Sequence, residues 1–156
     1  MKGWWIVNKF VWVIPLLMIL SGSQPNTPPA PITAGLGEKF SLIPGQAATI
    51  SGTDLTVTLS GIPGDQRCPL KIECAMSGPV TVPVAVRSGS GAAQEFILQT
   101  FTDNDGNVPG GEFGGMMVRV EYKGYVIQLV SILPFPQYST SEIQDDDYRV
   151  SFVVSK

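Results

Sequence analysis

Apolar and polar residues alternate with a period of two along several stretches of this chain, and this alternation restricts what it can fold into. Leu55, Val57 and Leu59 alternate with polar residues, and four valines repeat the pattern from Val80 to Val86. Successive side chains of a strand point to opposite faces of a sheet, so each stretch presents one apolar face. No apolar period of the helical kind continues for three turns in the same part of the chain.

Turn-forming residues separate these stretches at intervals of about 8 to 12 residues, which is typical of sandwich folds. We therefore expect an all-β fold, a single antiparallel β-sandwich of about seven or eight strands rather than a closed barrel. The expected strands cover residues 39–43, 47–50, 55–62, 80–87, 95–101, 116–122, 125–133 and 148–154.

Two local signals refine this expectation. Pro83 cannot donate a hydrogen bond to a ladder, which favours a sheet edge or a bulge for its strand. Lys123-Gly124 lies between two alternating stretches and predicts a tight hairpin turn.

The N-terminal residues 1–23 have the organisation of a signal peptide. A basic start is followed by the uncharged apolar run Phe10 to Leu20 and then by the small residues Ser21, Gly22 and Ser23. We expect this signal-type helix to be cleaved before Gln24, with a cut near Thr33 or Ala34 as an alternative. The other alternative is a retained N-terminal membrane anchor, although eleven apolar residues are short for a span of about 20.

Residues 24–37 contain four prolines and no apolar period, so they are expected to form an extended linker. The β-sandwich domain is then expected to occupy residues 38–156. A chain of 156 residues is the size of one ordinary domain.

The charge of the chain excludes one class of partner. The full sequence has a formal net charge of −3, and loss of Lys2 and Lys9 with the leader changes it to −5. The remaining basic residues are scattered singly, so nothing resembles a patch that neutralises phosphates. We expect no nucleic-acid partner.

Cys68 and Cys74 are the only cysteines, and they are separated by five residues. An exported chain meets oxidising conditions, so we expect them to pair. The closed loop is small, and chain entropy predicts a stabilisation of about 2.4 kcal/mol. A metal or redox role is the alternative.

The absence of histidine from the sequence removes the common nucleophilic triads and all histidine-ligated metal sites. We therefore expect no catalytic residues, no enzyme activity and no cofactor. A hydrolase that uses only two carboxylates stays open, because Asp and Glu are present and such enzymes need a pair across a cleft.

Asp103, Asp105 and Asn107 offer oxygen ligands at alternate positions, as calcium loops do. The twelfth position of such a loop falls on Gly114 instead of Glu, so the match is poor. The same residue types also form β-turns, and we expect a turn, with calcium as the weaker alternative. The acidic run 145–147 is expected to be a solvated loop.

Four residues mark a possible binding surface: Arg67 and Lys71 at the cysteine loop, and Phe135 and Tyr138 in a proline-bracketed loop. Prolines and a disulfide stiffen such loops in advance, so little entropy opposes association. The alternative is structural, with Arg67 bonded to loop carbonyls and Phe135 in the core.

Several segments together resemble a group of uncharacterised bacterial exported proteins and lipoproteins. They are Phe40–Gln46, Asp65–Pro69 with Cys74 and Gly78, Tyr125–Leu129, Leu133–Pro136 and Tyr148–Val154. In that group an Asp-Ser-Arg-Cys-Pro loop and a Trp-Ala-Gly-like element occur, whereas Gln66 replaces the Ser here and residues 75–78 lack the Trp. The resemblance implies export, a β fold and the disulfide, and it carries no activity.

The sequence thus favours an exported cell-envelope or extracellular module, periplasmic or at the cell surface, that binds or has a structural role. Its partner is expected to be an unknown protein or envelope component, with a membrane only if the N-terminal segment is retained. The alternatives are a carboxylate-dependent hydrolase and a protease inhibitor. The Asn-Pro-Thr-Thr-Gly-Tyr loop of chagasin-type inhibitors is absent.

Overall fold

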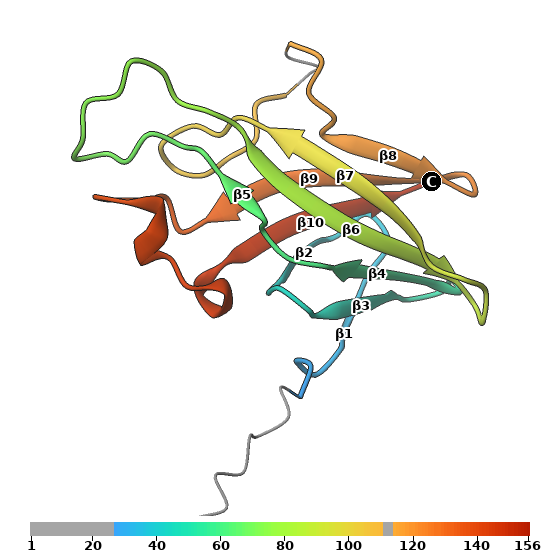
Figure 1. Ribbon diagram of the computed structural model, residues 1–156. Helices are drawn as coiled ribbons and strands as arrows, with labels where there is room; N and C mark the ends of the chain where they lie inside the picture. Colours follow the sequence, from blue (N-terminus) through green and yellow to red (C-terminus); the bar gives the residue numbers. More distant parts are fainter. Residues whose placement is uncertain (1–26, 111–113) are drawn as a thin grey trace, which may run out of the picture.

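Two β-sheets form the molecule, as the period-two alternation predicts. The computed structural model describes residues 27–110 and 114–156, and Figure 1 shows the strands in two layers. The strands are β1 (Ile32–Ala34), β2 (Lys39–Leu42), β3 (Ala47–Ile50), β4 (Leu55–Leu59), β5 (Gly64–Asp65), β6 (Val80–Ser88), β7 (Gln94–Thr100), β8 (Arg119–Tyr122), β9 (Tyr125–Leu133) and β10 (Arg149–Ser155). Two short 3-10 helices, η1 (Thr140–Glu142) and η2 (Asp145–Asp147), lie between β9 and β10.

The first sheet has six strands and is organised around β6. Strands β4 and β5 pair with successive parts of one side of β6, and β7 pairs with β6 along residues 80–86. Strands β3 and β1 extend the sheet beyond β4. The second sheet has four antiparallel strands in the order β2-β10-β9-β8.

One hydrophobic core lies between the sheets and takes side chains from both. The four alternate valines of β6 are fully buried, and Phe152 of β10 is the largest fully buried side chain on the opposite layer. A fully buried Val, Leu, Ile or Phe contributes about 1.5 to 3 kcal/mol relative to exposure. The all-β prediction and the alternating pattern that supports it are confirmed.

The structure corrects the prediction that all strands are antiparallel. Strand β1 runs parallel to β3, with Ile32 opposite Ala48 and Ala34 opposite Ile50. The same strand corrects the predicted linker of residues 24–37, because residues 32–34 belong to the sheet. A stretch of three residues is too short to show a period in the sequence. In the fold these residues pair with the backbone of β3, and Ala34 is buried in the core. The described part of the chain also has more strands than expected, because β1 and β5 are too short to be detected as alternations.

Pro83 lies inside β6, not at a sheet edge. On one side it is opposite Ile97 of β7, and on the other its carbonyl accepts a hydrogen bond from Ser60 N at 3.0 Å. Pro83 falls between the part of β6 that pairs with β5 and the part that pairs with β4. The missing N–H therefore costs no ladder bond.

The predicted hairpin turn at Lys123-Gly124 is confirmed. Tyr122 and Tyr125 pair across a two-residue loop, and both loop residues have positive φ, 51° and 80°. That backbone is the one a type I′ turn requires, and glycine adopts it without a steric penalty.

The predicted signal-type helix and its cleavage site before Gln24 lie outside the described residues. Within residues 27–110 and 114–156, no helix is long and apolar enough to cross a membrane.

Candidate functional site

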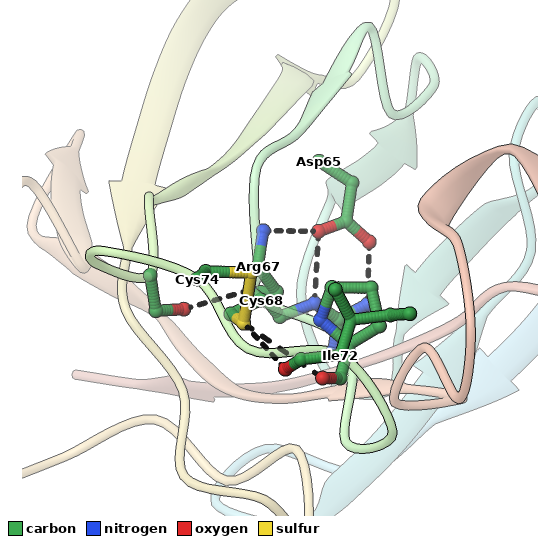
Figure 2. The surroundings of a disulfide bond; sticks show 7 residues. Asp65, Arg67, Cys68, Ile72 and Cys74 are labelled. Carbon is green, nitrogen blue, oxygen red and sulfur yellow. Dashed lines mark hydrogen bonds and ion pairs between the residues drawn. A yellow bond between two sulfur atoms is a disulfide. The ribbon is translucent and has the colours of Figure 1, made fainter.

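A buried ion pair lies where β5 ends and the cysteine loop begins. Arg67 Nη2 lies 2.6 Å from Asp65 Oδ2 and Nε lies 2.9 Å from Oδ1, so the two planar groups meet in a fork (Figure 2). The side chains are only 1% and 4% exposed, respectively. Residues two apart on an extended chain point the same way, which brings this acid and base together.

The remaining donors of Arg67 hold a distant segment. Nη1 donates to the carbonyl of Ile132 at 3.0 Å, and Nη2 donates to that of Pro134 at 2.9 Å. The guanidinium also lies over the ring of Phe135, 5.0 Å from its centroid. Arg67 therefore ties the cysteine loop to the end of β9.

Tyr148 closes the same cluster from the start of β10. Its hydroxyl donates to Asp65 Oδ2 at 3.0 Å. Burial and the nearby Asp65 carboxylate raise the pKa of Tyr148 far above its ordinary value. We call Asp65, Arg67, Phe135 and Tyr148 the Arg67 corner.

The disulfide between Cys68 and Cys74 is confirmed, with the two Cα atoms 5.9 Å apart. It indicates an oxidising compartment outside the cytoplasm. The loop it closes is also held by its backbone. Leu70 N and Lys71 N donate to the carbonyls of Pro136 and Gln137, at 3.0 and 2.8 Å.

Four large apolar side chains project from these loops into solvent. Leu70 and Ile72 lie inside the disulfide-closed loop, Met76 follows it, and Tyr138 follows the neighbouring proline-rich loop. They are 43%, 49%, 83% and 61% exposed, in that order. We call these four residues the loop-end surface.

The predicted binding surface is only partly at the surface of the molecule. Lys71 and Tyr138 are exposed, whereas Arg67 and Phe135 are buried against each other. The alternative interpretation, in which Arg67 bonds loop carbonyls and Phe135 packs inside, describes these two residues. Sequence reasoning missed Leu70, Ile72 and Met76, although a loop of seven residues is too short to bury its own apolar side chains.

Asp103 organises a turn, as expected for residues 103–107. Its Oδ1 accepts hydrogen bonds from Asp105 N and Asn107 N at 3.0 and 2.8 Å, and its Oδ2 accepts one from Asn107 Nδ2. These bonds lower the pKa of Asp103, with the bond from the Asn107 backbone as the largest cause. In the part of the chain described, no three side chains of Asp, Glu, His or Cys are grouped as a metal site requires.

An open groove of about 1100 Å³ lies between the segment before β1, the turn after β2, the end of β4 and the η1–η2 segment. Its lining comprises Thr27, Pro28, Pro29, Pro44, Gly45, Ser60, Ser141, Ile143, Gln144, Asp145 and Asp146. The acids are neighbours in η2 on one wall, and the lining contributed by residues 27–60 contains no carboxylate. The sequence did not predict this groove, because one of its walls comes from the segment expected to be a free linker.

Comparisons with protein-family models, with curated proteins and with solved structures found no match for this chain.

Proposed function

We propose that this chain is an exported, non-catalytic β-domain that binds a protein or another envelope component through the loop-end surface. The observation that carries the proposal is the exposure of Leu70, Ile72, Met76 and Tyr138 on loops that are held in place. Exposed apolar patches are characteristic of interaction sites in folded proteins, and the bonds of Leu70 N and Lys71 N to Pro136 and Gln137 bring the cysteine loop beside the loop of Tyr138.

Rigidity supports the same proposal. The disulfide closes the cysteine loop, and backbone hydrogen bonds join this loop to the proline-rich loop after β9. The side chain of Arg67 also bonds to the carbonyls of Ile132 and Pro134. Association loses less entropy when the contacting loops are already ordered. Tyrosine and large aliphatic groups also supply contact area at interfaces.

Export is proposed on two grounds: the signal-type N-terminus and the disulfide, which belongs to an oxidising compartment. The resemblance to uncharacterised exported bacterial proteins is consistent with this location and adds no activity.

The carboxylate-dependent hydrolase is less well supported. Such enzymes place two carboxylates on opposite sides of the scissile bond. In the groove described above, Asp145 and Asp146 lie on the same wall as sequence neighbours. A protease inhibitor also presents a rigid exposed loop, and it is retained as a special case of protein binding that protease assays would identify.

The proposal is tested with surface variants of the chain exported by a bacterial host. The triple variant Leu70→Ser, Ile72→Ser, Tyr138→Ser removes apolar area from the loop-end surface. The control variant Ile97→Ser, Met117→Ser removes exposed apolar side chains from another part of the molecule, where they are 63% and 51% exposed.

We expect the loop variant to lose about tenfold or more of its crosslinking to envelope components, because a few central contacts dominate interfaces. The control variant should crosslink like the natural chain. Equal crosslinking by both variants, at unchanged melting temperatures, would place the contact surface elsewhere.

A further inference from the structure

Acidic side chains follow Tyr138 of the loop-end surface along the chain, and their charge limits the chemistry of a partner that contacts this end of the domain. Tyr138 leads directly into η1 and η2, which carry Glu142, Asp145, Asp146 and Asp147. All four acids are exposed. In Figure 1 this segment and the cysteine loop lie at the same end of the strands, at the left of the view.

Two carboxylates line the groove, those of Asp145 and Asp146. The nearby Asp147 accepts a hydrogen bond from the backbone of Gln144 at 3.1 Å, and within residues 27–110 and 114–156 the side chain of Arg149 donates to the main-chain carbonyls of Asp146 and Tyr148. Among the described residues, no donor bonds to the carboxylate of Asp145 or Asp146. Their charge is therefore available to a ligand.

The groove that Asp145 and Asp146 line combines polar, apolar and acidic residues. Pro28, Pro29, Pro44 and Ile143 supply apolar lining, whereas Asp145 and Asp146 supply charge. Pro29 packs near the turn after β2, and the Gln46 side chain donates to the Ala30 carbonyl at 2.8 Å, so this wall is held in place. The volume of about 1100 Å³ is slightly above the usual range of small-ligand pockets, which ends at about 1,000 Å³, and the groove is open to solvent.

We infer that the partner is a protein segment in which apolar residues lie next to Lys or Arg, with its apolar side chains on the loop-end surface and its cations at Asp145 and Asp146. This inference rests on the proposed function and specifies the class of partner. Complementary charge selects partners and accelerates their encounter.

The same charges disfavour the other occupants. An anionic bilayer or a nucleic acid would meet four exposed carboxylates with Lys71 as the exposed cation of the loop. A divalent metal ion would find two carboxylates but no third acidic, histidine or cysteine ligand among the described residues.

The test uses the chain recovered after export and two fluorescent peptides of defined composition. One peptide repeats Lys-Leu-Ser, and the other repeats Glu-Leu-Ser, so the apolar content is matched. Fluorescence anisotropy is measured at low and at high salt. We expect the Lys peptide to bind about tenfold more tightly than the Glu peptide at low salt, with the difference shrinking as salt screens the charges.

Isosteric variants then locate the charge. Asp145→Asn with Asp146→Asn should weaken binding of the Lys peptide by about 3- to 10-fold, as expected for two exposed ion pairs. The matched control, Glu95→Gln with Glu121→Gln, removes two exposed carboxylates from β7 and β8 and should leave binding unchanged.

Three results would overturn the inference: equal binding of both peptides, equal affinity of the Asn variant and the natural chain, or loop-dependent sedimentation with phosphatidylglycerol vesicles in place of peptide binding. The first two leave the proposed function standing if the loop variant still loses its envelope crosslinks. Retained crosslinking by that loop variant contradicts the proposed function itself.

Discussion

Two aspartates in this domain use their carboxylates in opposite ways. Asp65 is buried, and it receives hydrogen bonds from Arg67 and from Tyr148, which is 83 positions away along the chain. Asp103 is exposed, and its partners lie two and four residues away. The two regions meet at Ile132, whose carbonyl accepts from Arg67 and whose N–H donates to Gly106 of the Asp103 turn.

The difference between Asp65 and Asp103 shows where a charged side chain stabilises contacts between distant segments and where it stabilises only a local turn. A buried carboxylate depends on its partners, because removal of one leaves an uncompensated charge in a medium of low polarity. An exposed carboxylate that bonds to adjacent backbone N–H groups is still solvated when a bond is lost. The Arg67 corner should therefore be sensitive to substitution, and the Asp103 turn tolerant.

The largest effect is expected from Arg67→Met, which breaks the corner at its centre. The variant keeps an apolar side chain over Phe135. It leaves the carboxylate of Asp65 and the carbonyls of Ile132 and Pro134 without their hydrogen-bond donor. Loss of one member of a buried ion pair costs about 3 to 5 kcal/mol. Urea unfolding followed by circular dichroism measures the change.

A double variant separates the cost of an unpaired buried charge from the loss of the remaining contacts of Arg67. Asp65→Asn combined with Arg67→Met removes both charges, so it should be less destabilising than the sum of the single changes. A cost for Arg67→Met within 0.5 kcal/mol of zero, the range typical of exposed positions, would contradict the contrast between the two regions.

The period of the sequence predicted the strands of the core, but it did not predict the contacts of the corner. The valines of β6 alternate because one face is buried, and that information is local. The pairing of Arg67 with the carbonyls of Ile132 and Pro134 joins segments 65 and 67 positions apart, which no spacing rule reports. The sequence therefore predicts a binding surface for Arg67 and offers bonds to loop carbonyls only as the alternative, without identifying which carbonyls.

The sequence did not predict strand β1, for a related reason. Residues 32–34 have no sustained alternation, and prolines precede them, so their local composition indicates a linker. Their place in the sheet depends on the free edge of β3, which is a property of the assembled fold. The exposed residues of the cysteine loop were predictable in principle, since the short spacing of the cysteines prevents their burial.

A smaller effect is expected when the covalent closure of the loop is removed. Cys68→Ser with Cys74→Ser should lower the free energy of unfolding by about 2 kcal/mol, because the unfolded chain regains the entropy of a small loop. The Arg67 corner and the bonds to Pro136 and Gln137 do not involve the sulfur atoms, so we expect them to persist in this variant. Chemical denaturation measures the change, and reduction of the natural chain should reproduce it.

A result as large as that of Arg67→Met would mean that the disulfide, not the ion pair, organises this end of the domain. In that case the comparison between the two aspartates would not explain its stability.

Tyr148→Phe should have a still smaller effect, because Asp65 keeps its fork with Arg67. Because Arg67 compensates the charge of Asp65, we expect the cost of a typical intramolecular hydrogen bond, about 0.5 to 1.5 kcal/mol. The pKa of Tyr148 is raised in the folded state, so its contribution is complete below the ordinary value of 10.0 and declines as pH rises above it.

The natural chain and Tyr148→Phe should therefore differ most below pH 10 and less above it. Melting curves across that range check the trend, with Tyr138→Phe as the control because its side chain is exposed. A difference between Tyr148→Phe and the natural chain that grows with alkaline pH would contradict this assignment of the proton.

The smallest loss of stability is expected from Asp103→Asn, which tests the exposed turn. Hydrogen bonds lower the pKa of Asp103 in the folded state, so its contribution is present above the ordinary value of 3.8 and is lost as pH falls below it. The variant should melt slightly below the natural chain at neutral pH, and the gap should close in acid. Asp105→Asn is the control, since the Asp105 carboxylate accepts no hydrogen bond within the described residues, and it should melt like the natural chain at neutral pH. If Asp103→Asn lowers the melting temperature as much as Arg67→Met does, an exposed turn is as important to the stability of this fold as a buried ion pair. The contrast between the two regions would then be wrong. A gap that persists unchanged at acid pH would assign the effect to side-chain geometry, because a protonated carboxyl and an amide carry the same charge.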